Sequence, residues 1–255
     1  KVTKQDGKVS KKQTIKAVDG VSFELKRGET LGVIGESGCG KSTLGRVLIH
    51  LEEPTSGEIL YGGVSSTKLK KKDRLAFCRT CQMIFQNPFD TFDPRYTIEK
   101  IFMSTLKLHK IGANDAERQQ IMIKTLEDAG MAPATDYIYR HPHELSGGQL
   151  QRISILRSML LRPSFLVADE PVSMLDVSIR ADIINMLQTL SKEENTAMVF
   201  ISHDIATTRY ISDRVAVMYL GRIVETGITD EVLHNPQHPY TKVLISNCAS
   251  LDPLE

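Results

Sequence analysis

Long apolar runs are missing from this sequence: none approaches the roughly 18 uncharged residues that a membrane-spanning helix needs. The first residues, KVTKQDGKVSKK, lack the apolar centre of a secretory signal peptide. An excess of one charge is missing too, since 32 Lys and Arg face 31 Asp and Glu, whereas non-specific nucleic-acid binding needs a broad positive field. We therefore expect a cytoplasmic protein whose main partner is not nucleic acid.

Cysteine is scarce, and four cysteines in 255 residues are too few for a disulfide framework. Internal repeats and low-complexity tracts are also absent from the sequence. Hydrophobic residues make up 41% of the chain, which is enough to bury a sizeable core. The basic run KLKKKDR, residues 68–74, is interpreted as a solvated surface.

Short apolar runs separated by helix-like segments predict a mostly parallel sheet covered by helices. The runs are residues 31–35, 81–85, 165–169, 197–202 and 214–220. Segments 21–29 and 56–63 alternate between apolar and polar residues, which predicts an antiparallel sheet beside the first run. Residues 87–163 show helical periodicity without a convincing strand, so we expect an inserted helical subdomain there.

The glycine-rich stretch GESGCGKS, from Gly35 to Ser42, fits the phosphate-binding pattern G-x-x-x-x-G-K-S/T in full. It follows an apolar strand and precedes an amphipathic helix, as such a loop requires. Gly35, Gly38 and Gly40 let backbone N–H groups turn inward around a phosphate, and the helix N-terminus favours the anion. Lys41 is expected to neutralise the outer phosphates, and Ser42 to ligate Mg²⁺. A glycine-rich turn without a ligand is the alternative.

Four polar residues follow predicted strands, at the edge where open α/β sheets bind ligands. Asp169 is a candidate Mg²⁺ ligand, and Glu170 is placed to deprotonate a water that attacks the γ-phosphate. A surface acidic pair that caps the next helix is the alternative for these two. Gln86 is placed to reach Mg²⁺ or the attacking water. His203 lies at the same edge, although a lone histidine is more often structural.

A second glycine-rich stretch, LSGGQ at residues 145–149, completes an ordered set of motifs. GESGCGKS, FQNP, LSGGQ, FLVADE, SMLD and SHD resemble, in this order, the nucleotide-binding subunits of ATP-binding-cassette (ABC) transporters over nearly the whole chain. Longer stretches around these motifs, such as HPHELSGGQLQR and LHNPQHPYTKVLI, are similar to the corresponding sequences of the ATPase subunits of dipeptide and oligopeptide importers. Nickel importers and some oligosaccharide importers use similar ATPases.

The resemblance implies a role for each matching residue. Asp169 is the Walker B aspartate, Glu170 the catalytic base and His203 the switch histidine. The Q-loop and D-loop contribute Gln86 and Asp176. The Walker A loop that binds ATP is Gly35, Glu36, Ser37, Gly38, Cys39, Gly40, Lys41, Ser42 and Thr43. The signature is Ser146, Gly147, Gly148 and Gln149, and the Mg²⁺ ligands are Ser42, Gln86 and Asp169.

The same resemblance implies an α/β fold with a P-loop NTPase (RecA-like) core, an N-terminal antiparallel β subdomain and an inserted α-helical subdomain. We expect residues 1–86 and 164–236 to form the core with its β subdomain, 87–163 the helical signature subdomain, and 237–255 a short C-terminal extension. The implied activity is ATP hydrolysis that drives peptide import.

The implied partners are a second ABC ATPase, two transmembrane permease subunits and an extracellular substrate-binding protein. The resemblance favours a second ATPase that is a different chain, whose ATP is capped by this chain's signature. This places the protein peripherally on the cytoplasmic face of the cell membrane, with segment 87–102 as the docking surface for a membrane subunit. A soluble cassette ATPase of DNA repair or translation and a small-molecule kinase are the alternatives.

Two positions around the Walker A loop carry further expectations. The aromatic residue that stacks on adenine in the family should precede IKAVDG, but Lys1 to Lys16 contain no aromatic residue, so aliphatic residues such as Ile15 are the alternative. Cys39 is expected to be the most reactive of the four thiols, because the helix N-terminus and Lys41 favour its thiolate.

Overall fold

The computed structural model describes residues 15–247 of the chain. Its main sheet has six strands in the order β4-β5-β6-β1-β7-β8, and all neighbouring strands are parallel except β7 and β8. In chain order these strands are β1 (Thr30–Ile34), β4 (Cys81–Ile84), β5 (Phe165–Asp169), β6 (Ala197–Ile201), β7 (Arg214–Tyr219) and β8 (Arg222–Ile228). The short strands β2 (Leu60–Tyr61) and β3 (Val64–Ser65) form a separate antiparallel hairpin. The mostly parallel sheet expected from the apolar runs is confirmed.

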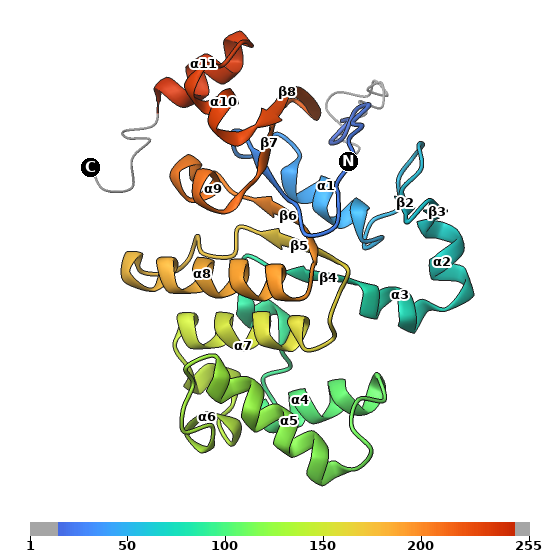
Figure 1. The fold of residues 1–255 in the computed structure, drawn as a ribbon, viewed down its shortest axis with the longest axis vertical. Coiled ribbons are helices and arrows are strands. Elements are labelled where there is room, and N and C mark those ends of the chain that lie inside the picture. The colour runs from blue at the N-terminus through green and yellow to red at the C-terminus, as the bar shows by residue number, and fades with distance from the viewer. Residues whose placement is uncertain (1–14, 248–255) are drawn as a thin grey trace, which may run out of the picture.

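The helices follow the strands in the alternating order that a covered parallel sheet requires (Figure 1). They are α1 (Lys41–Leu48), α2 (Ser66–Lys72), α3 (Arg74–Thr80), α4 (Ile98–Leu108), α5 (Asp115–Asp128), α6 (Thr135–Ile138), α7 (Gly147–Met159), α8 (Val177–Glu193), α9 (Ile205–Ile211), α10 (Thr229–His234) and α11 (Pro239–Ser246). Two 3₁₀ turns, η1 (Pro88–Thr91) and η2 (Pro142–Glu144), flank the α4–α6 region. None of the helices in the described part of the chain is long and apolar enough to cross a membrane.

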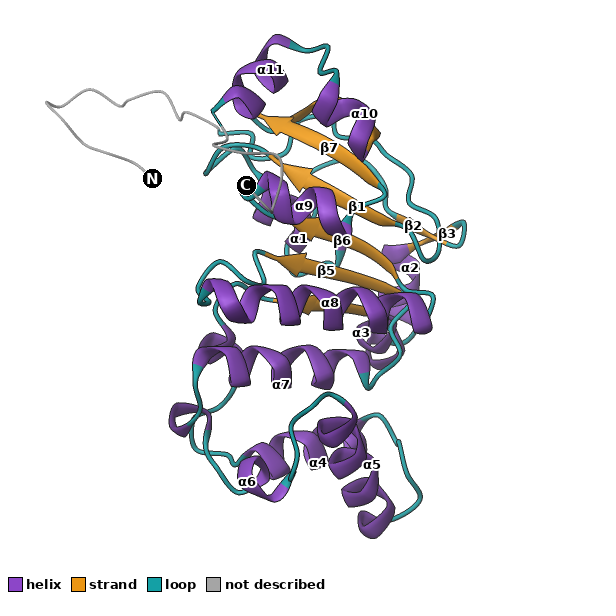
Figure 2. Cartoon of the chain, turned by 60° about the vertical axis from the view of Figure 1, so that its left-hand side comes forward, coloured by secondary structure: helices purple, strands orange, loops and turns teal. Residues whose placement is uncertain are grey.

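The sheet is buried on both faces because successive side chains of a strand point to opposite sides. In β5, Phe165 and Val167 join the core cluster that contains Leu44 of α1. Leu166 and Ala168 join the opposite cluster, to which α8 contributes. Figure 2 shows α8 and α9 in front of the strands and α1 behind them. The central strand β1 therefore lies between two helical layers.

Helix α7 connects the sheet layer to the helical segment that follows η1. Its Ile155 and Met159 belong to the sheet-side cluster, whereas Leu150 and Ile153 belong to the cluster of α4 and α5. Most residues of α7 are buried, because the helix packs between these two clusters. Segment 87–163 contains helices and no strand, as expected, while its status as a subdomain stays a prediction.

The expected antiparallel β subdomain is wrong in its extent. Segment 21–29 is not a strand in the structure, and segment 56–63 contributes only β2 to a hairpin. The alternation is nevertheless real, because Val21, Phe23 and Leu25 pack half-buried on the core while Ser22 and Glu24 are exposed. Side-chain alternation reports one-sided burial, and a strand additionally needs a neighbouring backbone to pair with.

Candidate functional site

The loop between β1 and α1 is the glycine-rich stretch singled out in the sequence. Gly35 and Gly40 have φ angles of +149° and +110°, which side-chain-bearing residues rarely adopt. A Cβ atom at Gly40 would lie 2.1 Å from the carbonyl oxygen of Ala17, and one at Gly35 would lie 2.2 Å from that of Met218. Glycine is therefore required by the close approach of two other backbone segments, one before the loop and one at the end of β7.

Lys41 points its ammonium group into this loop. Its Nζ atom donates hydrogen bonds to the carbonyl oxygens of Gly35, at 2.7 Å, and Glu36, at 2.9 Å, and lies 3.8 Å from Cys39 Sγ. The residue is only 5% exposed. Because neutral carbonyl groups do not balance an ammonium charge, a buried lysine held in this way favours an anionic ligand. The loop thus fits a phosphate-bearing substrate.

The end of β5 places Asp169 beside the first turn of α1. The Ser42 hydroxyl donates a hydrogen bond to Asp169 Oδ1 over 2.9 Å, and Asp169 is 5% exposed. Burial raises the pKa of the Asp169 carboxyl, while the hydrogen bond from Ser42 opposes the rise. A desolvated carboxylate beside a hydroxyl oxygen suits Mg²⁺, which prefers hard oxygen ligands together with substrate phosphates. The donor set therefore fits the expected metal.

Glu170 is the meeting point of three strand ends. Its Oε2 atom accepts a hydrogen bond from Gln86 Nε2 at 3.0 Å and lies 3.3 Å from His203 Nδ1. These three residues follow β4, β5 and β6, which are neighbours in the sheet. Glu170 has a φ of +47°, and its N–H donates to the Ile201 carbonyl. The backbone thereby turns sharply at this carboxylate and fixes its side chain against the other two.

A cavity of about 510 Å³ adjoins the loop and this cluster. Gln86 and Glu170 line the cavity together with the loop. Asp169 does not line it but accepts a hydrogen bond from Ser42, which does. The complete lining is Ile15, Lys16, Ala17, Ser37, Gly38, Cys39, Gly40, Lys41, Ser42, Thr43, Gln86, Glu170, Leu220 and Gly221. Leu220 and Gly221 were not predicted as site residues, because the turn after β7 lies beside the loop only as a result of the order of the strands in the sheet. The signature residues 146–149, Asp176 and His203 are not among the lining residues.

The signature stretch begins α7 instead of facing this cavity. Ser146 is the N-cap residue: its hydroxyl accepts a hydrogen bond from the Gln149 N–H, and its own N–H donates to Gln149 Oε1. Gly147 and Gly148 occupy the first turn, with the backbone of Gly148 pressed against Ile179 of α8. Asp176, at the N-cap of α8, is exposed, so residues 146–149 and Asp176 share one surface region formed by the starts of α7 and α8.

The two signature glycines are expected to respond differently to an added methyl group. A Cβ at Gly148 would lie 2.9 Å from Ile179 Cγ2, whereas a Cβ at Gly147 would meet only Leu175, at an ordinary 3.6 Å. Gly148→Ala should therefore destabilise the isolated chain by about 1–3 kcal/mol through overpacking, and Gly147→Ala should not. Denaturant unfolding of the two variants checks this, and equal midpoints would contradict the tight contact with α8.

The burial of Cys39 argues against its being the most reactive thiol, which stays a prediction. Cys39 is 6% exposed and lies beneath the loop, whereas Cys78 on α3 is exposed. Accessibility is needed for reaction as well as a favourable charge environment. The sequence pattern placed Cys39 at the helix N-terminus correctly, but it did not show on which side of the loop the sulfur points.

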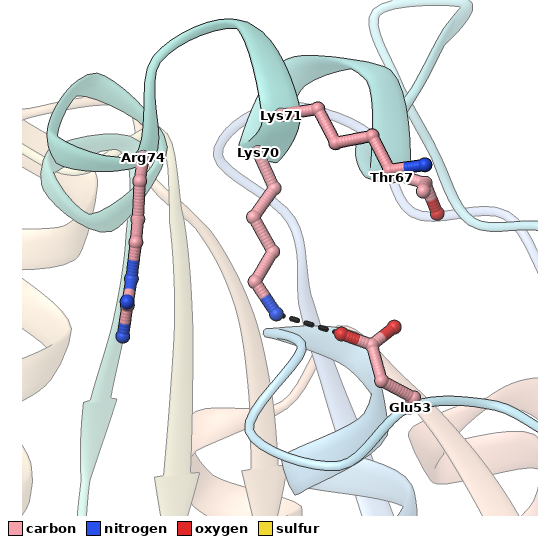
Figure 3. A pocket seen from close by; sticks show the side chains of 5 residues that line it. All are labelled: Glu53, Thr67, Lys70, Lys71 and Arg74. Atoms are coloured by element: carbon pink, nitrogen blue, oxygen red, sulfur yellow. Dashed lines mark hydrogen bonds and ion pairs between the residues drawn. The ribbon is translucent and has the colours of Figure 1, made fainter.

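A second depression, of about 540 Å³, lies away from the loop and contains part of the basic run (Figure 3). Lys70 donates hydrogen bonds to Glu53 Oε1 at 2.7 Å and to the His50 carbonyl. One of the cations that line the depression is therefore already paired with a carboxylate. Lys71 and Arg74 complete the basic side of the depression. Helices α2 and α3, which the sequence did not predict, carry this basic run along their solvent-facing sides.

Comparison with known proteins gives two matching family models. The model described as ABC transporter matches residues 18–173, and the model described as oligopeptide/dipeptide transporter, C-terminal region, matches residues 224–255. The chain is 47% identical over 247 residues to the oligopeptide transport ATP-binding protein OppF of Bacillus subtilis, covering 96% of this chain and 80% of that protein. It is 46% identical over 248 residues to the dipeptide transport ATP-binding protein DppF of Haemophilus influenzae, covering 97% and 75%.

Solved structures agree with these sequence matches. The dimeric bacterial ABC transporter cassette MJ0796 gives a TM-score of 0.76 at 26% identity, covering 86% of this chain and 94% of that chain. A post-hydrolysis dimer of the same cassette, bound to ADP and Pi, gives 0.74 at 25% identity, covering 90% and 95%. The fold expected from the sequence, an α/β P-loop NTPase, is confirmed by these neighbours.

Proposed function

The chain belongs to the ABC transporter family as an ATP-hydrolysing cassette, and from this premise we propose that it drives the import of peptides through separate membrane subunits. The cluster of Gln86, Glu170 and His203 beside the Ser42–Asp169 pair is the observation that carries the proposed chemistry. The names of OppF and DppF and the match of the C-terminal region support a peptide as cargo. Nickel and oligosaccharide uptake by the same kind of motor are the alternatives.

Residues of the loop bind the triphosphate. Lys41 exchanges its two carbonyl contacts for phosphate oxygens, and backbone N–H groups of the loop and of the first turn of α1 point toward the same charge. Ser42, Asp169 and Gln86 would hold Mg²⁺ through their side-chain oxygen atoms. Mg²⁺, when bound, neutralises charge that develops on the phosphates.

Glu170 acts as the general base for hydrolysis. Its carboxylate accepts the proton of a water molecule that attacks the γ-phosphate, while Gln86 and His203 hold the carboxylate in orientation from two sides. With 19% of its side chain exposed, Glu170 retains access to water at the cavity. The same contacts give Gln86 and His203 a means of sensing the state of the γ-phosphate.

The adenine is held by aliphatic residues. Ile15 and Leu220 line the cavity and are 90% and 70% exposed, which is unusual for large apolar side chains and supports a contact with a flat apolar ligand. Residues 1–14, which also lack an aromatic side chain, lie outside the described part of the chain.

A membrane subunit docks on segment 87–102, directly after Gln86. Phe89 and Tyr96 are 45% and 36% exposed, as an interface requires, whereas Phe92 is buried beneath Arg157 and serves packing. This docking surface is the first part of segment 87–163, which would act as the helical subdomain. The protein would accordingly work at the cytoplasmic face of the membrane, with two permease subunits and an extracellular substrate-binding protein.

A second ATPase completes the nucleotide site. The signature residues do not line the cavity of their own chain, and MJ0796 is a dimeric cassette, which supports a signature that caps ATP held by a partner. A different chain is the favoured partner. Met174 and Val177, 62% and 79% exposed beside Asp176, supply apolar surface for such a contact.

Nucleotide-dependent crosslinking tests the shared site. In a Glu170→Gln background, Ser146→Cys is combined with Ser37→Cys in the Walker A loop of the pairing chain, because Ser37 is exposed and the native Cys39 is buried. The native cysteines are replaced by serine, and a short bifunctional thiol reagent is added. We expect a crosslinked pair that depends on MgATP.

The pairing is made both with a second copy of this chain and with the partner ATPase, whose loop then carries the cysteine. Thr67→Cys, on the second depression, replaces Ser146→Cys as the control and should give no MgATP-dependent product. Crosslinks within one chain only, or equally abundant without ATP in both pairings, would refute the shared site.

A further inference from the structure

The C-terminal stretch HPYT, residues 238–241, contacts the Walker A loop. The Glu36 N–H donates a hydrogen bond to the Tyr240 hydroxyl over 2.9 Å, across 204 positions of the sequence. Tyr240 lies in the C-terminal region that matches the peptide-transporter family model, outside the segment that matches the ABC transporter model. A residue of the C-terminal region therefore holds a loop that belongs to the part matched by the ABC transporter model.

The residues around Tyr240 hold the start of its helix in place. His238 is the N-cap of α11, and its Nδ1 accepts a hydrogen bond from the Tyr240 N–H at 3.2 Å. Pro239 occupies the first turn, where its missing N–H costs nothing. Thr241 is fully buried. Glu225 of β8 accepts hydrogen bonds from the N–H groups of His238 and Gln237, which fixes the start of the helix on the sheet.

The tyrosine ring is also fixed. It packs on Tyr219 at the end of β7, with ring centroids 4.2 Å apart, and joins the apolar cluster that contains Ile34, the last residue before the loop. Burial raises the pKa of Tyr240, so its hydroxyl remains protonated at neutral pH. A rigid, neutral hydroxyl is thus presented to the first turn of the loop.

The contact acts on the atoms that hold Lys41. Glu36 uses its carbonyl oxygen to accept from Lys41 Nζ at 2.9 Å and its N–H to donate to Tyr240. On the other side of the loop, the Gly221 N–H donates to the Cys39 carbonyl. The loop is consequently braced from outside at two points, which leaves fewer conformations to lose when it closes around a phosphate chain.

We propose that Tyr240 is a positioning residue for nucleotide binding, which pre-orders the Walker A loop through the Glu36 amide and links the C-terminal region to occupancy of the site. The inference rests on the proposed function, since it takes the loop as the nucleotide site. Pre-organisation of the empty loop affects affinity more than the chemical step, which Glu170 performs on bound substrate.

Tyr240→Phe removes only the hydroxyl and keeps the ring contacts. We expect it to raise the Kd and KM for MgATP about threefold to tenfold, the value of one hydrogen bond of this kind, with kcat changed by less than about twofold. NMR hydrogen exchange should show faster exchange of the Glu36 amide in the nucleotide-free variant. Tyr219→Phe removes the same atom from the neighbouring ring, for which the described residues provide no hydrogen-bond partner, and is the matched control.

Lys41→Ala, measured beside them, separates this inference from the proposed function. Loss of MgATP affinity in Lys41→Ala, with wild-type affinity and wild-type Glu36 exchange in Tyr240→Phe, would overturn the role of Tyr240 and leave the nucleotide site intact. Weakening of equal size in Tyr219→Phe would overturn it as well. Wild-type affinity in Lys41→Ala would remove the nucleotide from the loop and both proposals with it.

Discussion

Glu170→Gln should bind MgATP as tightly as the wild-type chain and hydrolyse it at least about 100-fold more slowly, because general-base catalysis contributes roughly 10²–10⁴ to the rate. The amide retains the shape of the carboxylate and can still accept the hydrogen bond from Gln86, but it cannot take a proton from water. Phosphate release by the assembled transporter measures the loss. Size-exclusion chromatography should reveal an ATP-trapped pair of ATPase subunits.

Glu53→Gln is the matched control for this variant. Glu53 is likewise a carboxylate that contacts a histidine ring, His50 at 3.0 Å, but it lies in the second depression. Its variant should hydrolyse ATP as the wild type does. Turnover within about twofold of wild type in Glu170→Gln would correspond to less than about 0.5 kcal/mol of barrier and would show that Glu170 is not the base.

Lys41→Ala should lower the affinity for MgATP by about 100-fold or more. Lys41 is the buried cation of the loop, and hydrogen bonds between charged groups contribute roughly 1.5–3 kcal/mol each. Isothermal titration of the purified chain with MgATP measures this directly, without membrane subunits or turnover. The loss of binding distinguishes this variant from Glu170→Gln, in which binding persists and hydrolysis stops.

Lys41→Met separates charge from packing at this position. The methionine side chain fills most of the space of the lysine stem but leaves the carbonyl oxygens of Gly35 and Glu36 without the ammonium donor. Both variants should lose MgATP affinity to a similar degree if the charge is responsible. Wild-type affinity in Lys41→Met would show that the stem alone is sufficient and would contradict electrostatic binding of the phosphates.

The sequence predicted the parts of this molecule whose signal is local. Strand β5 coincides with the run FLVAD, because a continuous apolar segment of this length is buried on both faces of a parallel sheet. The residues that follow β4, β5 and β6 were expected at one edge, and the structure joins Gln86, Glu170 and His203 there. The expectation of parallel strands is sufficient for that inference, because their carboxyl ends meet at one edge whatever the order of the strands.

The parts that the sequence missed depend on distant contacts. Nothing in the sequence near Glu36 indicates that its N–H donates a hydrogen bond to Tyr240. The HPYT stretch was noted only for its resemblance to a family, and no contact was predicted for it. The alternation of segment 21–29 was detected, but its lack of a pairing partner was not. The burial of Cys39 within its loop was not predicted either. In each case the deciding quantity is the position of another backbone segment.

The central position of β1 has a consequence for how the protein is made. β1 pairs with β6 on one side and β7 on the other, both from the last third of the chain, and the loop after it is braced by Gly221 and Tyr240. A ribosome releases β1 early, long before these partners exist. The growing chain therefore carries an apolar strand with two unpaired edges, which exposes it to aggregation until β6 and β7 have been synthesised. Because the loop is braced only once Gly221 and Tyr240 are present, ATP can stabilise only a chain that has grown past these residues and not its earlier nascent forms.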